Sequence, residues 1–419
     1  MVRNKKASRP LDPILPILFQ FLSHYLSGFN CSTHGPRIST QGKRMICPSF
    51  AIFSLPFTGT TKVFEDYDPR LLEHRQNELQ AKKQLFQSSE MELKCLRDSE
   101  EQWESFDSIK KVFNLYRTPI SDYVIEHWRD DDFFGNQFMN GPNPNFIKRC
   151  SELPDNFPVT EEMVKPFLAS GSSLANEMTR GNVFICNYKR MQDLPTAWTG
   201  GKPAALTAAL CLLYLTPDQK LVPIAIQTSL LANGSNELSR RALSETTYSS
   251  LCLPENLEAR GLMSLPNFYY RDDALRNWNI INRFVKAMVD YYYPSDTSVS
   301  MDTELQDWIK DIFMFGFLSN TNSGIPQRFQ TAEEVIKFIT MVIYTSSVHH
   351  ASVNNGQFDF IWPPNSPLIM RKGPPHTKGQ TNLQTIFETM PLKGISSYFV
   401  TLGWLLTKKY TGYVSIVRH

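Results

Sequence analysis

Two side chains that can bind metal lie four positions apart, at His350 and Asn354. A helix over this segment would stack them one turn apart on a single face. An imidazole nitrogen and an amide oxygen form a neutral donor pair, which suits iron or manganese better than a thiolate-seeking ion. The pair supplies only two ligands. The alternative is therefore a polar helix face or a hydrogen-bonded core histidine.

The residues around this pair extend the pattern between positions 340 and 379. The series contains His350-Ala-Ser-Val-Asn354-x-Gly-Gln357, Trp362-x-Pro-Asn365-x-Pro367, Met370-Arg371 and Thr377-Lys378-Gly379. In this order it resembles the iron-ligand helix and the following loop of animal lipoxygenases.

Other segments resemble the same family without offering metal ligands. They are Tyr123 to Gly141, Leu153 to Thr160, Phe268 to Asp273 and Tyr291 to Asp296. In the first, His127 stands beside Trp128 and Asp130, and we expect it to make surface hydrogen bonds. We expect the last two segments to be helix ends packed by aromatic rings.

The resemblance implies a non-haem iron dioxygenase that converts polyunsaturated fatty acids and molecular oxygen into hydroperoxides. It makes His350 an iron ligand and Asn354 a weaker one, beside an apolar channel for the acyl chain. It also implies a peripheral contact with membranes. His349 lies about 100° further round the helix and cannot join the pair.

The chain departs from the family pattern at three places. Relatives carry two histidines in a His-x4-His arrangement where this chain runs from Gln227 directly to Ser235. No histidine occurs between His127 and His349, and the last residue is His419 where the family has a ligating isoleucine. The preceding β-barrel domain is not recognisable in residues 1–60. Two alternatives follow: a catalytically inactive lipid-binding or interaction protein, or an incomplete or alternatively spliced sequence.

Composition restricts the class of protein. With 419 residues, 42% of them hydrophobic, the chain can bury a large core. A net charge of +2 gives no electrostatic attraction toward nucleic acid, so nucleic-acid binding is not expected. Seven scattered cysteines without a Cys-x-x-Cys motif predict reduced thiols and a cytoplasmic protein. The apolar stretch at 14–22 contains Pro16 and is too short to span a membrane.

Hydrophobic spacing predicts the elements that position the pair. We expect long helices over 273–293, 303–317 and 332–354, the last largely buried, and a charged, solvated helix over 69–86. Short strands are expected over 182–188, 209–215 and 221–226. The predicted fold is mainly α, a lipoxygenase-type helical domain with a small β element. Residues 1–66 form an unassigned leader, and 67–419 form a truncated catalytic domain with a deletion near 228–234.

Overall fold

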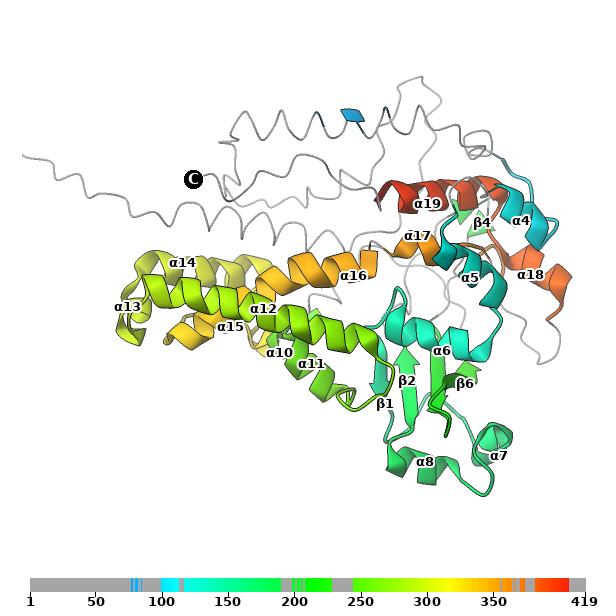
Figure 1. Cartoon of the computed structure of the whole chain (residues 1–419), viewed down its shortest axis with the longest axis horizontal. Coiled ribbons are helices and arrows are strands. Elements are labelled where there is room, and N and C mark those ends of the chain that lie inside the picture. Colours follow the sequence, from blue (N-terminus) through cyan, green and yellow to red (C-terminus); the bar gives the residue numbers. More distant parts are fainter. Residues whose placement is uncertain are drawn as a thin grey trace, which may run out of the picture.

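The structure is a computed structural model that describes residues 77, 80, 81, 84, 99–112, 117–189, 198–199, 202–203, 205, 208–227, 244–354, 356–363, 365, 370–373 and 381–406. Most of these residues are helical, and the strands form a small antiparallel sheet and a short hairpin (Figure 1). The predicted mainly α fold with a small β element is confirmed. The predicted leader over 1–66 and the deletion near 228–234 lie outside the described residues.

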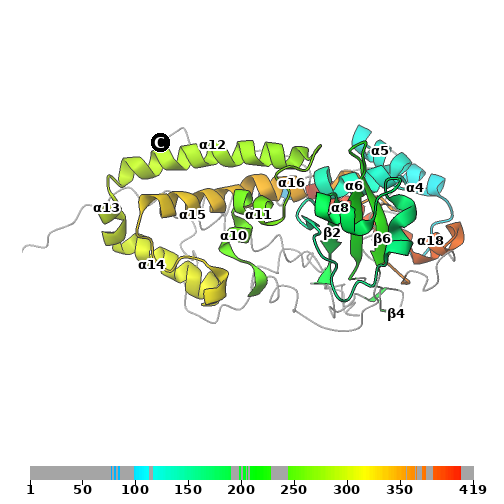
Figure 2. The ribbon, with the colours of Figure 1, turned by 90° about the horizontal axis from the view of Figure 1, so that it is seen from below.

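Three helices form the body of the molecule: α12 (Tyr269–Tyr292), α14 (Thr303–Asp311) and α15 (Ala332–Tyr344). Helix α15 lies between the other two (Figure 2). Its Phe338 ring packs on Trp308 of α14, with ring centroids 5.6 Å apart. Apolar side chains are buried on several sides of α15, as expected of a central helix.

The predicted long helices are present, with two interruptions. Helix α12 begins at Tyr269, before the predicted Asp273. The segment predicted over 303–317 ends in a π-helical turn, η5 (Ile312–Gly316). The segment predicted over 332–354 consists of α15, a π-helical turn η7 (Thr345–His349) and α16 (His350–Asn354).

The main sheet has the order β1-β2-β5-β6, with every neighbouring pair antiparallel. Its strands are β1 (Ile147–Arg149), β2 (Val183–Asn187), β5 (Leu210–Leu215) and β6 (Leu221–Gln227). One face contributes to the main helical core, and the other packs over a second core with α7 (Glu161–Val164) and α8 (Leu174–Arg180). Because both faces are covered, the central strands are almost continuously apolar.

Strand β6 carries a proline at Pro223, where the pairing with β5 shifts register between Leu212 and Leu213. Proline cannot donate a ladder hydrogen bond, so it is tolerated at edge strands and bulges. Both conditions hold here, since β6 is the last strand of the sheet. The three strands predicted from the sequence match β2, β5 and β6, and the three-residue strand β1 was missed.

A further apolar cluster joins segments from the two ends of the described chain. It contains Trp103, Trp362, Met390 and Trp404. The Trp103 indole nitrogen donates to Ser396 Oγ at 3.2 Å. This cluster places residues 99–109 against the last described helix, α19 (Lys393–Leu406).

The remaining elements are short connections. They are α4 (Phe106–Val112), α5 (Pro119–His127), α6 (Asp131–Asn140), η3 (Lys165–Phe167), β3 (Trp198–Thr199), β4 (Lys202–Pro203), α10 (Tyr248–Leu251), α11 (Leu253–Ala259), α13 (Asp296–Met301), η6 (Thr321–Ser323), α17 (Gln357–Phe360) and α18 (Leu383–Thr389). In the predicted solvated helix over 69–86, the described residues 77, 80, 81 and 84 are helical and exposed. Among the described residues, no helix combines the length and apolarity needed to cross a membrane.

Candidate functional site

His350 follows directly on the π-helical turn η7. In this turn the side chain of Ser346 donates to the carbonyl oxygen of Val342 at 2.6 Å, and the hydroxyls on either side of it also donate to carbonyls one turn back. Hydroxyl side chains that bond back to the helix in this way compete with the regular α-helical pattern. The run Thr345-Ser-Ser therefore favours a local change of helical pitch.

The π-helical turn sets the direction in which α16 presents its residues. Each π turn inserts an extra residue into the helix, and such insertions occur frequently at functional sites. The apolar spacing over 332–354 predicted one regular helix, without this turn. The three consecutive hydroxyl residues were the signal that could have revealed it.

His349 is engaged by a residue distant in sequence. The Asn145 side-chain amide donates to His349 Nε2 at 2.9 Å, and the imidazole lies nearly parallel to the Tyr344 ring. Burial, together with the neighbouring charges of His350 and Arg260, lowers the pKa of His349 to about 4. His349 is therefore neutral at pH 7 and is bound to Asn145.

Arg260 supplies a half-buried positive charge near this cluster. Its Nη1 donates to the carbonyl oxygens of Pro144 and Ile147 at 2.8 and 3.0 Å, and its Nε donates to Asn256 Oδ1. Burial lowers its pKa to about 10, so it remains charged at neutral pH. Arg260 and Asn145 were not predicted from the sequence, because neither belongs to a motif and both are far from His350 along the chain.

The loop after α16 is fixed to helices from the first part of the chain. Asn365 and Gln137 form a reciprocal amide pair, with donor-acceptor distances of 2.9 and 3.1 Å. The Thr118 hydroxyl donates to Asp359 at 2.5 Å. Trp362 is fully buried in the adjoining apolar cluster. These contacts tie the motif residues after position 356 to α5 and α6.

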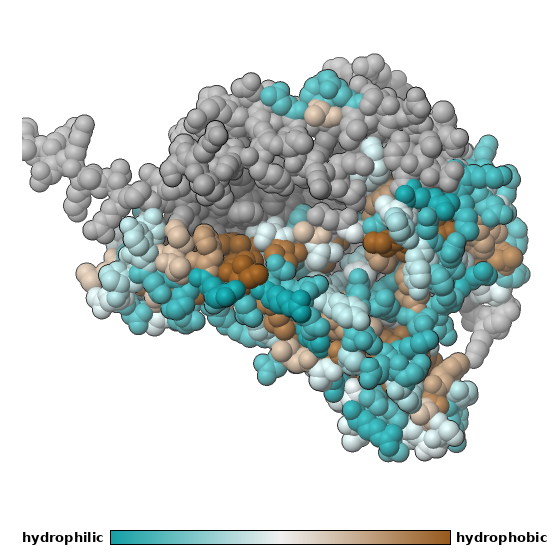
Figure 3. Space-filling view, viewed as in Figure 1, coloured by the Kyte–Doolittle hydropathy of each residue, from teal (hydrophilic) through white to brown (hydrophobic). Residues whose placement is uncertain are grey.

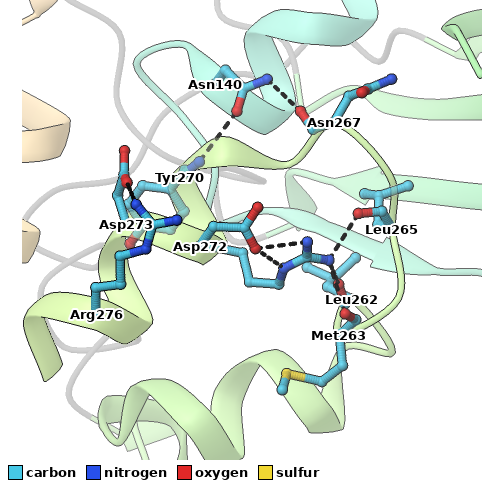
Figure 4. Close-up of polar contacts among 10 residues, drawn as sticks. Asn140, Leu262, Met263, Leu265, Asn267, Tyr270, Asp272, Asp273 and Arg276 are labelled. Carbon is cyan, nitrogen blue, oxygen red and sulfur yellow. Dashed lines mark hydrogen bonds and ion pairs between the residues drawn. The ribbon is translucent and has the colours of Figure 1, made fainter. Parts of the chain in front are cut away.

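The start of α12 is built from two of the segments noted in the sequence (Figure 4). Asn140 of α6 accepts a hydrogen bond from the Tyr270 backbone N–H and donates to the carbonyl of Asn267. Arg271 donates to the carbonyl oxygens of Leu262, Met263 and Leu265 and pairs with Asp272. The segment is thus a structural helix start, as predicted.

Other histidines do not converge on His350 in the described part of the chain. His127 lies at the end of α5 and bonds to Asp130 at 2.6 Å, both half-exposed, as predicted for a surface residue. The side chain of Asn354 lies outside what the structure describes, as do His24, His34, His74, His376 and His419. The geometry of the His350 and Asn354 pair therefore stays a prediction.

The described residues do not complete an iron centre. Non-haem iron sites use several ligands, typically with a carboxylate that offsets the metal charge. Among the described residues, no three His, Cys, Asp or Glu side chains gather closely enough to hold a metal ion. His350 contributes one suitable imidazole, and the adjacent His349 is occupied by Asn145.

Comparison with known proteins agrees with this architecture. The solved structure of a calcium-dependent 11R-lipoxygenase superimposes with a TM-score of 0.68 and 28% identity, covering 76% of this chain and 62% of that chain. The family model Lipoxygenase matches residues 250–406. A mainly helical body with a small antiparallel sheet is thus the fold that this chain shares with lipoxygenases.

Sequence relatives agree over most of the chain. Human polyunsaturated fatty acid lipoxygenase ALOX15B is 30% identical over 84% of this chain and 73% of the relative. Mouse arachidonate 12-lipoxygenase, 12R-type, and human hydroperoxide isomerase ALOXE3 are each 33% identical over 76% of this chain. The chain spans 59% of the length of each of these two relatives. This chain belongs to the lipoxygenase family.

Proposed function

We propose that this protein is a lipoxygenase-type dioxygenase, which adds molecular oxygen to a polyunsaturated fatty acid to give a hydroperoxide. The observation that supports it best is the helix with His350 at its π-helical turn, inside the region that matches the family model. His350 and Asn354 are the residues proposed as iron ligands. A peripheral contact with membranes, where such fatty acids reside, and a cytoplasmic location are parts of this proposal.

The thiols support the proposed cytoplasmic location. The described cysteines, Cys150, Cys186, Cys211 and Cys252, are all free and buried. Cys186 and Cys211 are direct partners on β2 and β5. Two positions along the ladder, the Tyr188 backbone N–H donates to the carbonyl oxygen of Ala209. Because hydrogen-bonded and non-hydrogen-bonded pairs alternate, the cysteine pair is of the same hydrogen-bonded type. Such pairs hold their side chains further apart than non-hydrogen-bonded pairs, which does not favour a disulfide.

A second candidate function is that of a fatty-acid-binding member of the family without catalysis. Among the described residues, which leave out the side chain of Asn354, no three His, Cys, Asp or Glu side chains gather to hold a metal ion. The two candidates make opposite predictions for bound metal. Both predict binding of a polyunsaturated fatty acid.

Bound iron and product formation test the proposal directly. We expect purified protein to hold iron and to convert linoleate to a product with conjugated-diene absorbance in the ultraviolet. His350→Ala should lower both iron content and diene formation at least tenfold, because it removes the strongest described donor. Asn354→Ala should have a smaller effect on iron content, because an amide oxygen is a weaker ligand.

His127→Ala is the matched control, because this imidazole is on the surface and bonded to Asp130. It should leave iron content and diene formation unchanged. Wild-type protein without iron or diene formation, but with saturable binding of linoleate, would reject the dioxygenase and support the fatty-acid-binding candidate. Loss of iron in His127→Ala and not in His350→Ala would reject the assignment of His350.

A further inference from the structure

Helix α12 carries a second apolar face that points away from the core. Its inner side buries Trp278, Val285 and Val289. On the outer side, Ile280, Phe284 and Tyr291 are 55%, 62% and 80% exposed. Spacings of four and seven residues place these three side chains on one face. We call Ile280, Phe284 and Tyr291 the outer stripe. Single exposed apolar residues are ordinary, but an aligned set on one helix marks an interaction surface.

Basic side chains border the outer stripe. A shallow, open depression on α12 is lined by Arg276, Asn279, Ile280 and Arg283. The two arginines lie about two helical turns apart, on either side of Ile280 along the helix. Among the described residues, Arg276 makes a long contact to Asp273, at 3.5 Å, and its side chain is 77% exposed. Figure 3 shows hydrophobic residues beside strongly hydrophilic ones over this part of the molecule.

Among the described elements, none covers this face of α12. In Figure 2, α12 runs along the outer edge of the helical body, and no described element lies beyond it. An amphipathic helix at a membrane surface has this combination of aliphatic, aromatic and basic residues. The aromatic rings and Ile280 would enter the headgroup region, while the guanidinium groups meet lipid phosphates.

The charges beside the outer stripe argue against a second copy of this chain as its binding partner. A symmetric dimer uses the same surface of both subunits. A two-fold axis between Ile280 and Phe284 would bring Arg283 of one subunit close to Arg283 of the other. Like charges at such short range oppose association, whereas an anionic surface is attracted by them.

We propose that the outer stripe, with Arg276 and Arg283, is a docking surface for an anionic lipid bilayer. This inference rests on the proposed membrane contact and is independent of catalysis. It identifies the element that makes the contact and the chemical class of its partner.

Co-sedimentation of the full chain with lipid vesicles tests the docking surface. Vesicles of phosphatidylcholine alone are compared with vesicles that also contain phosphatidylserine. Wild-type protein should bind the anionic vesicles more strongly. Ile280→Ser with Phe284→Ser should lower the partition coefficient for both vesicle types at least tenfold, because each side chain loses its apolar burial. Arg276→Gln with Arg283→Gln should lower binding to anionic vesicles by about fivefold per charge and leave the neutral vesicles unaffected.

The matched control replaces two apolar residues of similar exposure on the sheet part of the molecule. Met163 and Phe167 are 59% and 54% exposed, and Met163→Ser with Phe167→Ser should bind like wild type. Equal thermal midpoints establish that every variant is folded. The proposal is overturned if the Ile280→Ser, Phe284→Ser variant binds vesicles as strongly as the wild-type protein. It is also overturned if the wild-type protein is a dimer in sedimentation velocity and this variant becomes monomeric while its vesicle binding is unchanged. Absence of diene formation with intact, stripe-dependent vesicle binding rejects the enzymatic proposal alone.

Discussion

At the scale of single residues, Glu177 shows how a buried carboxylate is stabilised. It is 1% exposed and lies in α8. Its oxygens accept hydrogen bonds from Ser172 Oγ at 2.5 Å, Asn182 Nδ2 at 2.7 Å and Arg180 Nη1 at 2.8 Å. Burial raises the pKa of Glu177, but these hydrogen bonds together lower it more. The net pKa lies below the ordinary value of 4.5.

This shift predicts a pH-dependent contribution to stability. A lowered pKa in the folded state means that the unfolded chain binds more protons near pH 4. The stabilisation is therefore complete above pH 4.5 and is lost as the pH falls through the folded pKa. Glu177→Gln should reduce the free energy of unfolding by about 1–3 kcal/mol at pH 7, measured with urea. The difference from wild type should shrink at pH 4 and below.

Glu258→Gln provides the comparison, because Glu258 is exposed. This variant should match wild type at both pH values. A Glu177→Gln deficit that is equally large at pH 7 and pH 3 would show that the carboxylate contributes through shape and not through charge.

At the scale of elements, the packing of α6 on β6 depends on Gly135. A Cβ atom at this position would lie 1.8 Å from the carbonyl oxygen of Leu221, a contact that no side chain can make. Because the obstructing atom belongs to the backbone, it cannot rotate away. The glycine thus permits the close approach of helix and strand that positions Gln137 for its pair with Asn365.

Gly135→Ala should therefore destabilise the protein by about 3 kcal/mol or more, since α6 must move away from β6. Urea unfolding of purified protein measures the effect. Gly356→Ala is the control, because its Cβ would meet nothing within 4 Å. Equal stability of the two variants would contradict the close packing of α6 on β6.

At the scale of the whole molecule, Trp103 joins two segments nearly three hundred residues apart. It is 2% exposed, and besides its bond to Ser396, the backbone of Glu101 accepts from the Lys393 N–H at 2.9 Å. Trp103 belongs to a core separate from the one around α15. Loss of this contact should loosen α19 before it affects the centre of the molecule.

Trp103→Ala should reduce the free energy of local unfolding around α19 by about 3–5 kcal/mol, because a large buried ring is removed. Hydrogen exchange should accelerate in α19 while the amides of α15 keep their protection. Trp103→Phe retains an aromatic ring but loses the bond to Ser396, and it should show a smaller change. Uniform acceleration over α15 and α19 would show that the two cores unfold as one.

Local patterns in the sequence determined the class of elements and most of their positions. The apolar spacing over 332–354 predicted a buried helix, and α15 is buried because helical periodicity reports burial directly. The strands around Val183, Leu210 and Leu221 were also predicted, since apolar runs between turn residues mark covered sheets. The motif around His350 pointed to the lipoxygenase family, which the relatives then established.

Only the tertiary structure decided which distant residues surround that motif. Asn145 donates to His349, Arg260 lies half-buried near the same turn, and Asn140 accepts a hydrogen bond at the start of α12. None of these contacts has a periodic signature in the sequence. The π-helical turn also depends on side-chain hydroxyls and surrounding packing, which spacing alone does not encode. Periodicity records whether a residue faces the core. Partners across the core are fixed by how the elements pack, because hydrogen bonds between them depend on three-dimensional positions and not on separation along the chain.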